Sequence, residues 1–230
     1  MRDLIKPTTL RFEVERYLRQ AIITGEYQSG DRLIERELCE LLKVSRASLR
    51  EALRTLEAEK LIEITPYKGP MVSTITKKEA EELLSFRCLI EGFAAHEFAR
   101  LATDKQINEL GETVRAMLNE ASSKNQQKLV KAKAHFYEIL LNGIDNKLLA
   151  ETHFALLRRG SLLRNTSVDQ PERLEHALEE VEELFNCIKK KDPIQARRAA
   201  EKHVREMERF ALSAFDKTEN EDKPPKRRKK

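Results

Sequence analysis

The chain has 230 residues, which is enough for one large domain or two modest ones. A hydrophobic fraction of 40% supports a packed core, and only 7 Gly and 7 Pro argue against a turn-rich β fold and favour long helices. The net charge of +4 is too small to predict nucleic-acid binding, so any such affinity must come from locally placed Arg and Lys.

The sequence has no apolar run of membrane-spanning length, and its first residues lack the apolar core of a secretory signal. The cysteines Cys39, Cys88 and Cys187 are far apart, odd in number and without CxxC spacing, which favours reduced thiols. We therefore expect a cytoplasmic protein with no membrane partner.

The first 76 residues predict a small domain with helices and one β-hairpin. Apolar residues at helical spacing indicate a helix over residues 9–24, and a turn with two glycines follows it. A short helix over residues 34–42 and a tight turn lead to Ser45, which should cap a third helix ending near residue 59. Residues 61–64 and 71–75 alternate as two strands around a turn. This order predicts a winged helix-turn-helix domain with a small β-wing in residues 1–76.

From residue 77 to residue 215 the pattern is helical throughout, and Thr76 with Glu79 predicts a capping box at its start. The amphipathic stretches predict an antiparallel α-helical bundle, so the fold as a whole should be mostly α. The expected helices are residues 77–102, 104–122, 126–142, 146–164, 172–190 and 193–215. Residues 216–230 have a basic, almost wholly polar composition and should form a disordered basic tail. This tail either adds non-specific phosphate affinity or is an inert, solvated end.

The third predicted helix has the properties of a DNA-recognition helix. Leu49, Leu53 and Leu56 form a face that would hold it against the domain. The opposite face carries polar and basic side chains close to the helix N-terminus, whose backbone N–H groups suit a phosphate. These side chains are Ser45, Arg46, Ser48 and Arg50.

Arg46 and Arg50 are four residues apart, so both could reach the same DNA, one a phosphate and the other a guanine edge. Arg36, at the start of the preceding helix, is placed to contact the DNA backbone. Lys68 and Gly69 at the tip of the wing suit a narrow minor groove. The alternative is that Arg46, Arg50 and Arg54 form a solvated stripe paired with neighbouring glutamates.

Residues 10–75 resemble the N-terminal winged-helix domain of the GntR family of bacterial transcription regulators. The resemblance rests on G-x-Y-x-x-G-x-x-L-x-E-x-x-L, then V-S-R-x-x-x-R-E-A-L-x-x-L, then a late Gly in the wing. Residues 86–110 resemble the opening of the all-helical C-terminal domain of the FadR subfamily. The resemblance implies a sequence-specific regulator, most often a repressor, that binds a palindromic operator as a homodimer.

The resemblance also implies the DNA-contact positions Arg36, Ser45, Arg46, Ser48, Arg50, Lys68 and Gly69. The family commonly has Thr or Ser where this chain has Ala47, so one hydrogen bond to DNA should be missing here.

Many members of the subfamily bind a divalent metal in the helical domain through one Asp and three His. By this resemblance Lys133 replaces the Asp, Tyr137 and Val181 replace two of the His, and His203 alone remains. An ammonium repels the cation that it would have to bind, so we expect neither a metal nor another cofactor. A displaced ligand at His176 is the alternative, in a metal-binding member of the same family.

Our hypothesis is that Lys133 attracts an anionic effector, such as a carboxylate, in a pocket lined by Arg87, Tyr137 and His203. The effector would shift the populations of two arrangements of the recognition helices and so change operator affinity. The alternative is a structural or apolar pocket with Lys133 in solvent. His96, His135 and His153 are interpreted as lone histidines on helices.

Other classes of function fit the sequence less well. No Ser or Cys nucleophile stands in a recognisable constellation with His and an acid, so the chain is not expected to be an enzyme. A DNA-packaging protein, or any DNA-binding protein without an effector response, would not need the large, charge-balanced helical domain.

Overall fold

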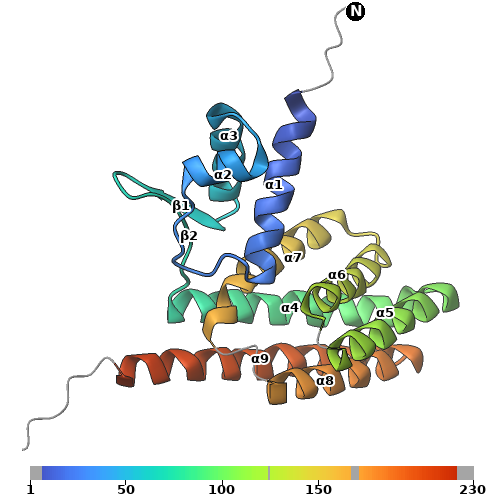
Figure 1. Cartoon of the computed structure of the whole chain (residues 1–230). Helices are drawn as coiled ribbons and strands as arrows, with labels where there is room; N and C mark the ends of the chain where they lie inside the picture. The colour runs from blue at the N-terminus through green and yellow to red at the C-terminus, as the bar shows by residue number, and fades with distance from the viewer. Residues whose placement is uncertain (1–6, 124, 167–170, 222–230) are drawn as a thin grey trace, which may run out of the picture. The chain divides into compact units, whose positions relative to one another are not determined.

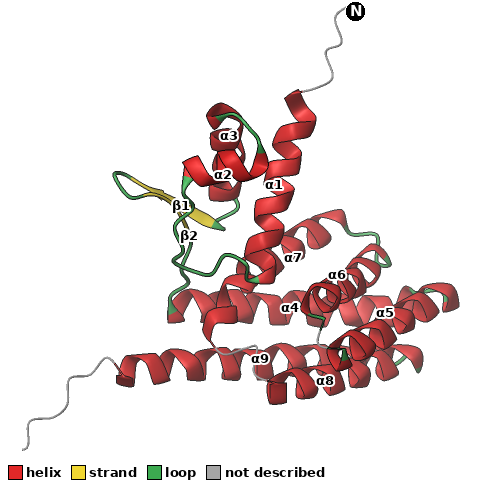
Figure 2. Cartoon of the chain, viewed as in Figure 1, coloured by secondary structure: helices red, strands yellow, loops and turns green. Residues whose placement is uncertain are grey.

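The structure, a computed structural model, describes residues 7–123, 125–166 and 171–221. The chain divides into two compact units. The first contains the residues up to Ile75 together with Phe154–Asn165, and the second contains Thr76–His153 and the residues from Thr166 onward. Figure 1 labels the elements, and Figure 2 shows that helices dominate, which confirms the mostly α fold.

The first unit is a winged helix-turn-helix, as predicted. The strands β1 and β2 pair antiparallel, from Ile62 opposite Val72 to Thr65 opposite Gly69. The return strand therefore begins at Gly69, two residues before the predicted start, because the pairing reaches the turn itself. The elements are α1 (Pro7–Thr24), α2 (Glu35–Leu42), α3 (Arg46–Ala58), β1 (Ile62–Thr65) and β2 (Gly69–Val72).

The core of the first unit lies between α1, α3 and the hairpin. Leu18, Leu49, Leu56 and Leu61 are wholly buried in one hydrophobic cluster. Burying each such side chain stabilises the fold by about 1.5–3 kcal/mol. This packing leaves the opposite face of α3 open to solvent.

A segment distant in sequence completes the first unit. It comprises the end of α7 (Lys147–Gly160) and most of the 3-10 helix η1 (Ser161–Thr166). Leu162 is buried in the same hydrophobic cluster, and Ser29 Oγ donates a hydrogen bond of 3.0 Å to its carbonyl oxygen. Arg158 Nε lies 3.5 Å from Glu59 Oε2, and Arg19 donates two hydrogen bonds to the same carboxylate. Periodicity alone assigns residues 154–165 to the helical domain, because it carries no information on such distant packing.

The second unit is the predicted helical bundle. Within it α4 packs along α9, α5 packs on α6 and α8, and α8 packs on α9. Thr76 and Thr103 each form a capping box, with Glu79 and Gln106 respectively, and the first of these was predicted. The second unit contains the first part of α7 and, among the described residues, five further helices. These are α4 (Lys77–Leu101), α5 (Asp104–Ser122), α6 (Gln126–Asn142), α8 (Pro171–Lys189) and α9 (Pro193–Glu221).

Two helix ends differ from the sequence-based expectation. The predicted helix over residues 146–164 ends as an α-helix at Gly160 and continues as the 3-10 helix η1. The last helix, α9, extends to Glu221, so residues 216–221 are helical rather than disordered. Lys77 Nζ contacts Asp216 Oδ1, which ties this extension to the start of α4. The rest of the predicted tail, residues 222–230, lies outside the described residues.

Candidate nucleic-acid interface and effector site

The N-terminus of α3 is capped by Ser45, as predicted. Ser45 has an extended backbone with φ −71° and ψ 153°, and its Oγ accepts a hydrogen bond from the backbone N–H of Ser48 at 3.2 Å. The two hydroxyl oxygens are 3.0 Å apart, so Ser45 and Ser48 form one small polar group at the helix start. Such a cap typically stabilises a helix by about 1 kcal/mol.

Arg50 is held by an acidic residue that the sequence analysis did not single out. Its Nε lies 3.1 Å from both carboxylate oxygens of Glu35, and its Nη2 lies 3.1 Å from Oε2. The hydrogen bonds to Glu35 raise the pKa of Arg50. Glu35 is the first residue of α2, so this pair joins the two helices of the helix-turn-helix. No local pattern could reveal it, because the partners are 15 residues apart.

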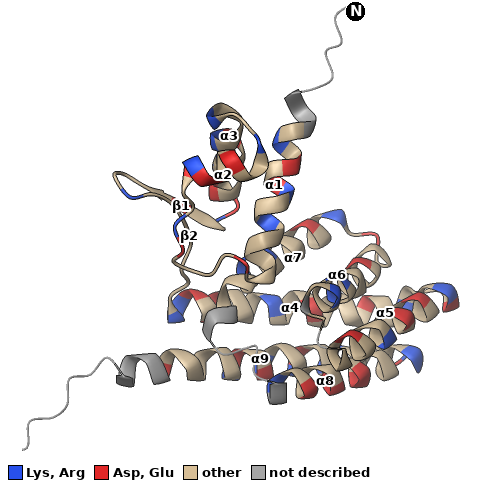
Figure 3. Cartoon of the chain, viewed as in Figure 1, with Lys and Arg blue, Asp and Glu red and all other residues tan. Residues whose placement is uncertain are grey.

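The other predicted cations of this face are exposed. Among the described residues, neither Arg36 nor Arg46 forms an ion pair. Arg54, farther along α3, approaches Glu51 at 4.0 Å. The alternative of a paired, solvated stripe therefore fits Arg50 and Arg54, which both face a glutamate. Arg46, like Arg36 of α2, remains available to a ligand. Figure 3 shows basic residues on both α2 and α3.

The wing tip is a tight turn that exposes Lys68. Gly69 has φ +80°, a backbone conformation that favours glycine, and Tyr67 has φ +66° with a fully exposed ring. Arg32 Nη2 donates a hydrogen bond of 2.7 Å to the carbonyl oxygen of Lys68 and so supports the tip. Tyr67 and Arg32 were not singled out from the sequence. The sequence signal available for Tyr67 was its place in the turn TPYKGP.

The helical unit contains a buried polar cluster centred on Glu91. Arg87 Nε donates to Glu91 Oε1 at 2.8 Å, and His153 Nε2 lies 3.0 Å from the same oxygen. The hydroxyl of Tyr137 donates to Glu91 Oε2 at 2.8 Å. All four side chains are buried, and they come from α4, α6 and α7. The cluster therefore links three helices through one carboxylate.

The charges in this cluster shift the pKa values of its members. Burial alone would raise the pKa of Glu91, but the Arg87 guanidinium and the hydrogen bond with His153 outweigh it and hold that pKa far below its usual range. Burial and the Glu91 carboxylate raise the pKa of Tyr137 well above its usual value. Glu91 is therefore ionised and Tyr137 is protonated at neutral pH, which fixes the direction of the hydrogen bond between them.

His203 belongs to a neighbouring group. Its Nδ1 lies 2.7 Å from Glu180 Oε2, and Arg173 forms a bidentate pair with Glu180 at 3.2 and 3.0 Å. The Nε2 atom of His203 is buried and has no hydrogen-bond partner among the described residues. Burial lowers the pKa of His203, against the opposing effect of Glu180, and the ammonium of Lys133 lowers it further. Lys133 is half-buried, so it does not simply point into solvent.

A groove of about 650 Å³ lies next to this group between α8 and α9. Glu180 and Arg173 line it, so the groove and His203 share a wall. The other lining residues include His176, Lys202, Arg209 and Phe210.

The four predicted pocket residues therefore belong to two separate groups in the structure. Arg87 and Tyr137 meet at Glu91, whereas Lys133 acts on His203. The interpretation of three histidines as lone side chains is wrong, because each lies close to a glutamate. His153 contacts the buried Glu91, His96 Nδ1 is 2.9 Å from Glu97, and His135 Nδ1 is 3.2 Å from Glu138. A sequence signal for Glu91 did exist. It stands four residues after Arg87 on the apolar face of a helix, and a charged pair at that spacing indicates a buried ion pair.

The residues present do not fit a metal. Tyr137 is engaged by Glu91, Val181 has no donor atom, and His176 is exposed and faces Glu179. Within residues 7–123, 125–166 and 171–221, no three His, Cys, Asp or Glu side chains are grouped as metal ligands. The same part of the chain contains no helix both long and apolar enough to span a membrane.

Comparison with known proteins extends these observations. Residues 10–72 match the family described as bacterial regulatory proteins, gntR family, and residues 82–206 match the FCD domain. The chain is 30% identical over 213 residues to the HTH-type transcriptional repressor NanR of Edwardsiella tarda, covering 83% of this chain and 81% of the relative. It is 26% identical over 203 residues to the galactonate operon transcriptional repressor of Escherichia coli, covering 80% and 88%. The solved structure of E. coli McbR/YncC has the same fold, with a TM-score of 0.78 at 21% identity over 90% of this chain and 98% of that one.

Proposed function

Because this chain belongs to the GntR family of bacterial regulatory proteins and carries an FCD domain, we propose that it represses transcription as a homodimer on a palindromic operator. We further propose that a small carboxylate bound in the helical unit controls its operator affinity. The observation that carries the proposal is the open N-terminus of α3, capped by Ser45 and flanked by exposed Arg46 and by Arg36 of α2.

This arrangement suits the major groove of DNA. The groove admits an α-helix, and the first turn of that helix carries the donors for phosphates and base edges. Ser45 and Arg36 would contact phosphates, while Arg46 and Arg50 would approach bases. Glu35 holds the Arg50 guanidinium in a defined plane, which a bidentate contact to guanine requires. Lys68 at the wing tip would add a contact to the minor groove.

One short helix contacts too few bases to select a genomic site, so two copies are needed. Two copies related by a two-fold axis require two half-sites with the same symmetry. This is the physical basis for proposing a palindromic operator.

We place the proposed carboxylate effector near His203. His203 presents a buried nitrogen without a partner among the described residues, and Lys133 supplies positive charge nearby. The galactonate operon repressor and a gluconate operon repressor of Bacillus licheniformis, 29% identical over 132 residues, are named for operons of sugar acids. These names make an aldonate a reasonable first choice of effector class.

A carboxylate entering this region would compete with Glu91 for Arg87 and Tyr137. His153, the remaining partner of Glu91, is on α7, and the later residues of that helix belong to the first unit. Effector binding would thus change the contacts of α7, which continues into η1, where Leu162 is buried in the winged-helix core. The effector changes operator affinity only if it binds one of the two arrangements of the recognition helices more tightly than the other.

The test begins with selection of bound fragments from a fragmented bacterial genome. A shared short palindrome is expected, whereas sequence-independent coating would indicate packaging and no binding would contradict the proposal. The operator found in this way is then titrated with gluconate and galactonate, with glucose and galactose as uncharged controls. Release by an acid but not by its neutral sugar is expected. Lys133→Met should retain operator binding and lose this response.

Metal-dependent control is tested separately by calorimetric titration with Zn²⁺ or Ni²⁺. Weak or no binding is expected. Tight one-to-one binding would contradict the metal-free site and would favour a displaced ligand set.

A further inference from the structure

The helix α4 carries an apolar stripe on the face turned away from the bundle. Leu89 is 63% exposed and Phe93 is 47% exposed, while their neighbours Cys88, Gly92 and Ala95 are buried. Phe86, at 46% exposure, extends the stripe by one turn. Single exposed apolar side chains are common, but a contiguous group of this size on one helix typically marks a contact surface.

Two charged residues lie on the same stripe, one at each end. Glu82 precedes Leu89 by seven residues, and Arg100 follows Phe93 by seven residues. Residues separated by four or seven positions share a helix face, so Glu82, Leu89, Phe93 and Arg100 form one row. All four are exposed. The row is about 27 Å long at a rise of about 1.5 Å per residue.

This row is complementary to itself when reversed. A second α4 laid antiparallel, with a two-fold axis passing at the level of Glu91, brings Leu89 against the partner's Phe93. The same operation places Glu82 opposite the partner's Arg100, and symmetry makes each contact occur twice. We propose that this stripe is the surface through which two copies of this chain form the dimer, with α4 packed antiparallel on the partner's α4.

The charges are what select a second copy as the occupant. A central apolar pair flanked by opposite charges at equal distances matches its own inverse, and a parallel alignment would put each charge against its like. Existing contacts do not prevent the pairing. Arg100 Nη2 is 2.6 Å from Glu97, and Lys78 Nζ is 3.9 Å from Glu82, but all these groups are near the surface. Arg100 can reach a second carboxylate while it keeps Glu97.

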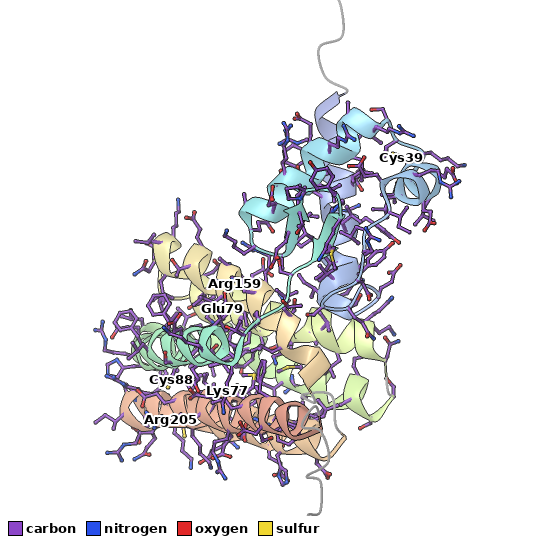
Figure 4. All side chains as sticks on the ribbon, turned by 90° about the vertical axis from the view of Figure 1, so that its left-hand side faces the viewer. Cys39, Lys77, Glu79, Cys88, Arg159 and Arg205 are labelled. Atoms are coloured by element: carbon purple, nitrogen blue, oxygen red, sulfur yellow. The ribbon has the colours of Figure 1, made fainter. Side chains whose placement is uncertain are left out.

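The neighbouring helix α9 supplies an ordered polar rim. A Cβ at Gly92 would lie 2.8 Å from the Glu201 side chain, so the glycine allows Glu201 to lie directly on α4. Glu201 in turn pairs with Arg197 at 2.8 Å and with Arg205 at 2.9 Å. Figure 4 labels Cys88 of α4 and Arg205 of α9 at this contact. An apolar centre with a polar, charged rim is the usual anatomy of a protein interface.

This inference rests on the proposed homodimer, and the first test measures the dimer directly. Sedimentation velocity at several concentrations gives the dissociation constant of the full chain. Leu89→Arg places two like charges at the centre of the interface and should raise that constant at least about tenfold. The matched control is Leu148→Arg, because Leu148 is 74% exposed on α7 outside the stripe. Far-UV circular dichroism should show the same helical content for both variants, which establishes that each is folded.

The second test determines the register. Glu82→Arg and Arg100→Glu should each weaken the dimer, about tenfold, because each sets like charges opposite one another. The double variant restores opposite charges and should return to within about threefold of the wild type. Additive weakening in the double variant would overturn the antiparallel register.

A monomeric wild type, or a dimer unaffected by Leu89→Arg, would overturn the interface. Operator binding by the wild type is measured in parallel. If a shared palindrome is bound but the Leu89→Arg protein stays dimeric, this interface fails and the regulator remains. If no operator is bound while Leu89→Arg still dissociates the dimer, the proposed function fails and the interface remains.

Discussion

Arg50 of α3 and Glu35 of α2 form a bidentate ion pair, with Arg50 Nε 3.1 Å from both carboxylate oxygens. The pair connects the recognition helix to the helix before it and leaves Arg50 exposed at the same time. In the proposed complex with DNA, Glu35 would position Arg50, because it holds the plane of the guanidinium.

Loss of an arginine from this face should weaken operator binding. Arg46→Ala or Arg50→Ala should cost about 1–3 kcal/mol if the side chain contacts a base, and it should relax the preference at one position of the half-site. Arg54→Ala is the control, because Arg54 is farther along α3 and already approaches Glu51. Fluorescence anisotropy with the operator and its single-base variants measures both effects. Equal, uniform losses for all three arginines would indicate phosphate contacts only.

Glu35→Gln removes the charge that orients Arg50 but leaves the arginine in place. We expect the operator to be bound with reduced discrimination among bases, while affinity for unrelated DNA rises because a carboxylate has gone. Competition of operator against random DNA at fixed salt measures the ratio of the affinities for the two DNAs. An unchanged ratio would mean that Glu35 has no positioning role.

Two substitutions of Ser45 distinguish its role as a helix cap from its proposed role in phosphate binding. Ser45→Asp preserves a good capping oxygen, so the stability of the first unit should change little, whereas Ser45→Ala should cost about 1 kcal/mol. For operator affinity we expect the opposite order, with Ser45→Asp binding DNA more weakly than Ser45→Ala. The carboxylate introduced by Ser45→Asp would repel the phosphate that the helix N-terminus attracts. Urea unfolding and operator titration of the two variants provide the comparison. Operator binding by Ser45→Asp as tight as that of Ser45→Ala would place the phosphate elsewhere.

The elements of this fold that follow from local pattern were predictable. The cap at Ser45, the box at Thr76 and the helices α4–α6 follow from the period of apolar residues and from the chemistry of helix ends. The wing followed from the alternation of residues 61–64 and 71–75 around a turn, and the resemblance to the GntR family agreed with it. What periodicity could not supply was pairing between distant residues, as in Glu35 with Arg50, or Leu162 with the core of the first unit.

The buried cluster illustrates the same limit within the helical unit. Arg87 and Glu91 are four residues apart and could have been paired from the sequence, but Tyr137 and His153 reach Glu91 from other helices. The motif comparison identified Tyr137 and His203 as positions in one site. It could not show that Glu91 occupies the region between Arg87 and Tyr137, because that carboxylate is no part of the motif.

Glu91→Ala should strongly destabilise the helical unit. It leaves the Arg87 guanidinium buried without its partner, and breaking a buried pair in this way costs about 3–5 kcal/mol. The double variant Arg87→Met/Glu91→Leu removes both charges and should recover much of that loss. Denaturant unfolding followed by circular dichroism measures both variants. A double variant no more stable than Glu91→Ala would show that the other hydrogen bonds of Glu91 dominate.

Lowering the pH should decrease the free energy of unfolding, because Glu91 becomes protonated. Its pKa is lowered in the folded protein, so the unfolded chain takes up the proton first as the pH falls. The stabilisation from this carboxylate is therefore complete above the unfolded pKa of 4.5 and is lost progressively below it, by up to about 1.4 kcal/mol per pH unit. Unfolding free energies between pH 6 and pH 3 should fall less steeply for Glu91→Gln than for the wild type. Glu138→Gln, at an exposed site on α6, is the control and should follow the wild type.

Leu162 tests whether residues 154–165 belong energetically to the winged-helix unit. Its side chain is 5% exposed in a cluster with Leu49 and Leu56, so Leu162→Ala should cost about 2–5 kcal/mol. The effect should appear as faster hydrogen exchange of the amides of α3 and β1, which that cluster supports. Leu148→Ala, at an exposed position of α7 outside residues 154–165, should change stability by less than about 0.5 kcal/mol. If Leu162→Ala instead leaves exchange in α3 unchanged and accelerates it only in the bundle, residues 154–165 stabilise the helical unit, and the proposed link from Glu91 through α7 to the DNA-binding unit is wrong.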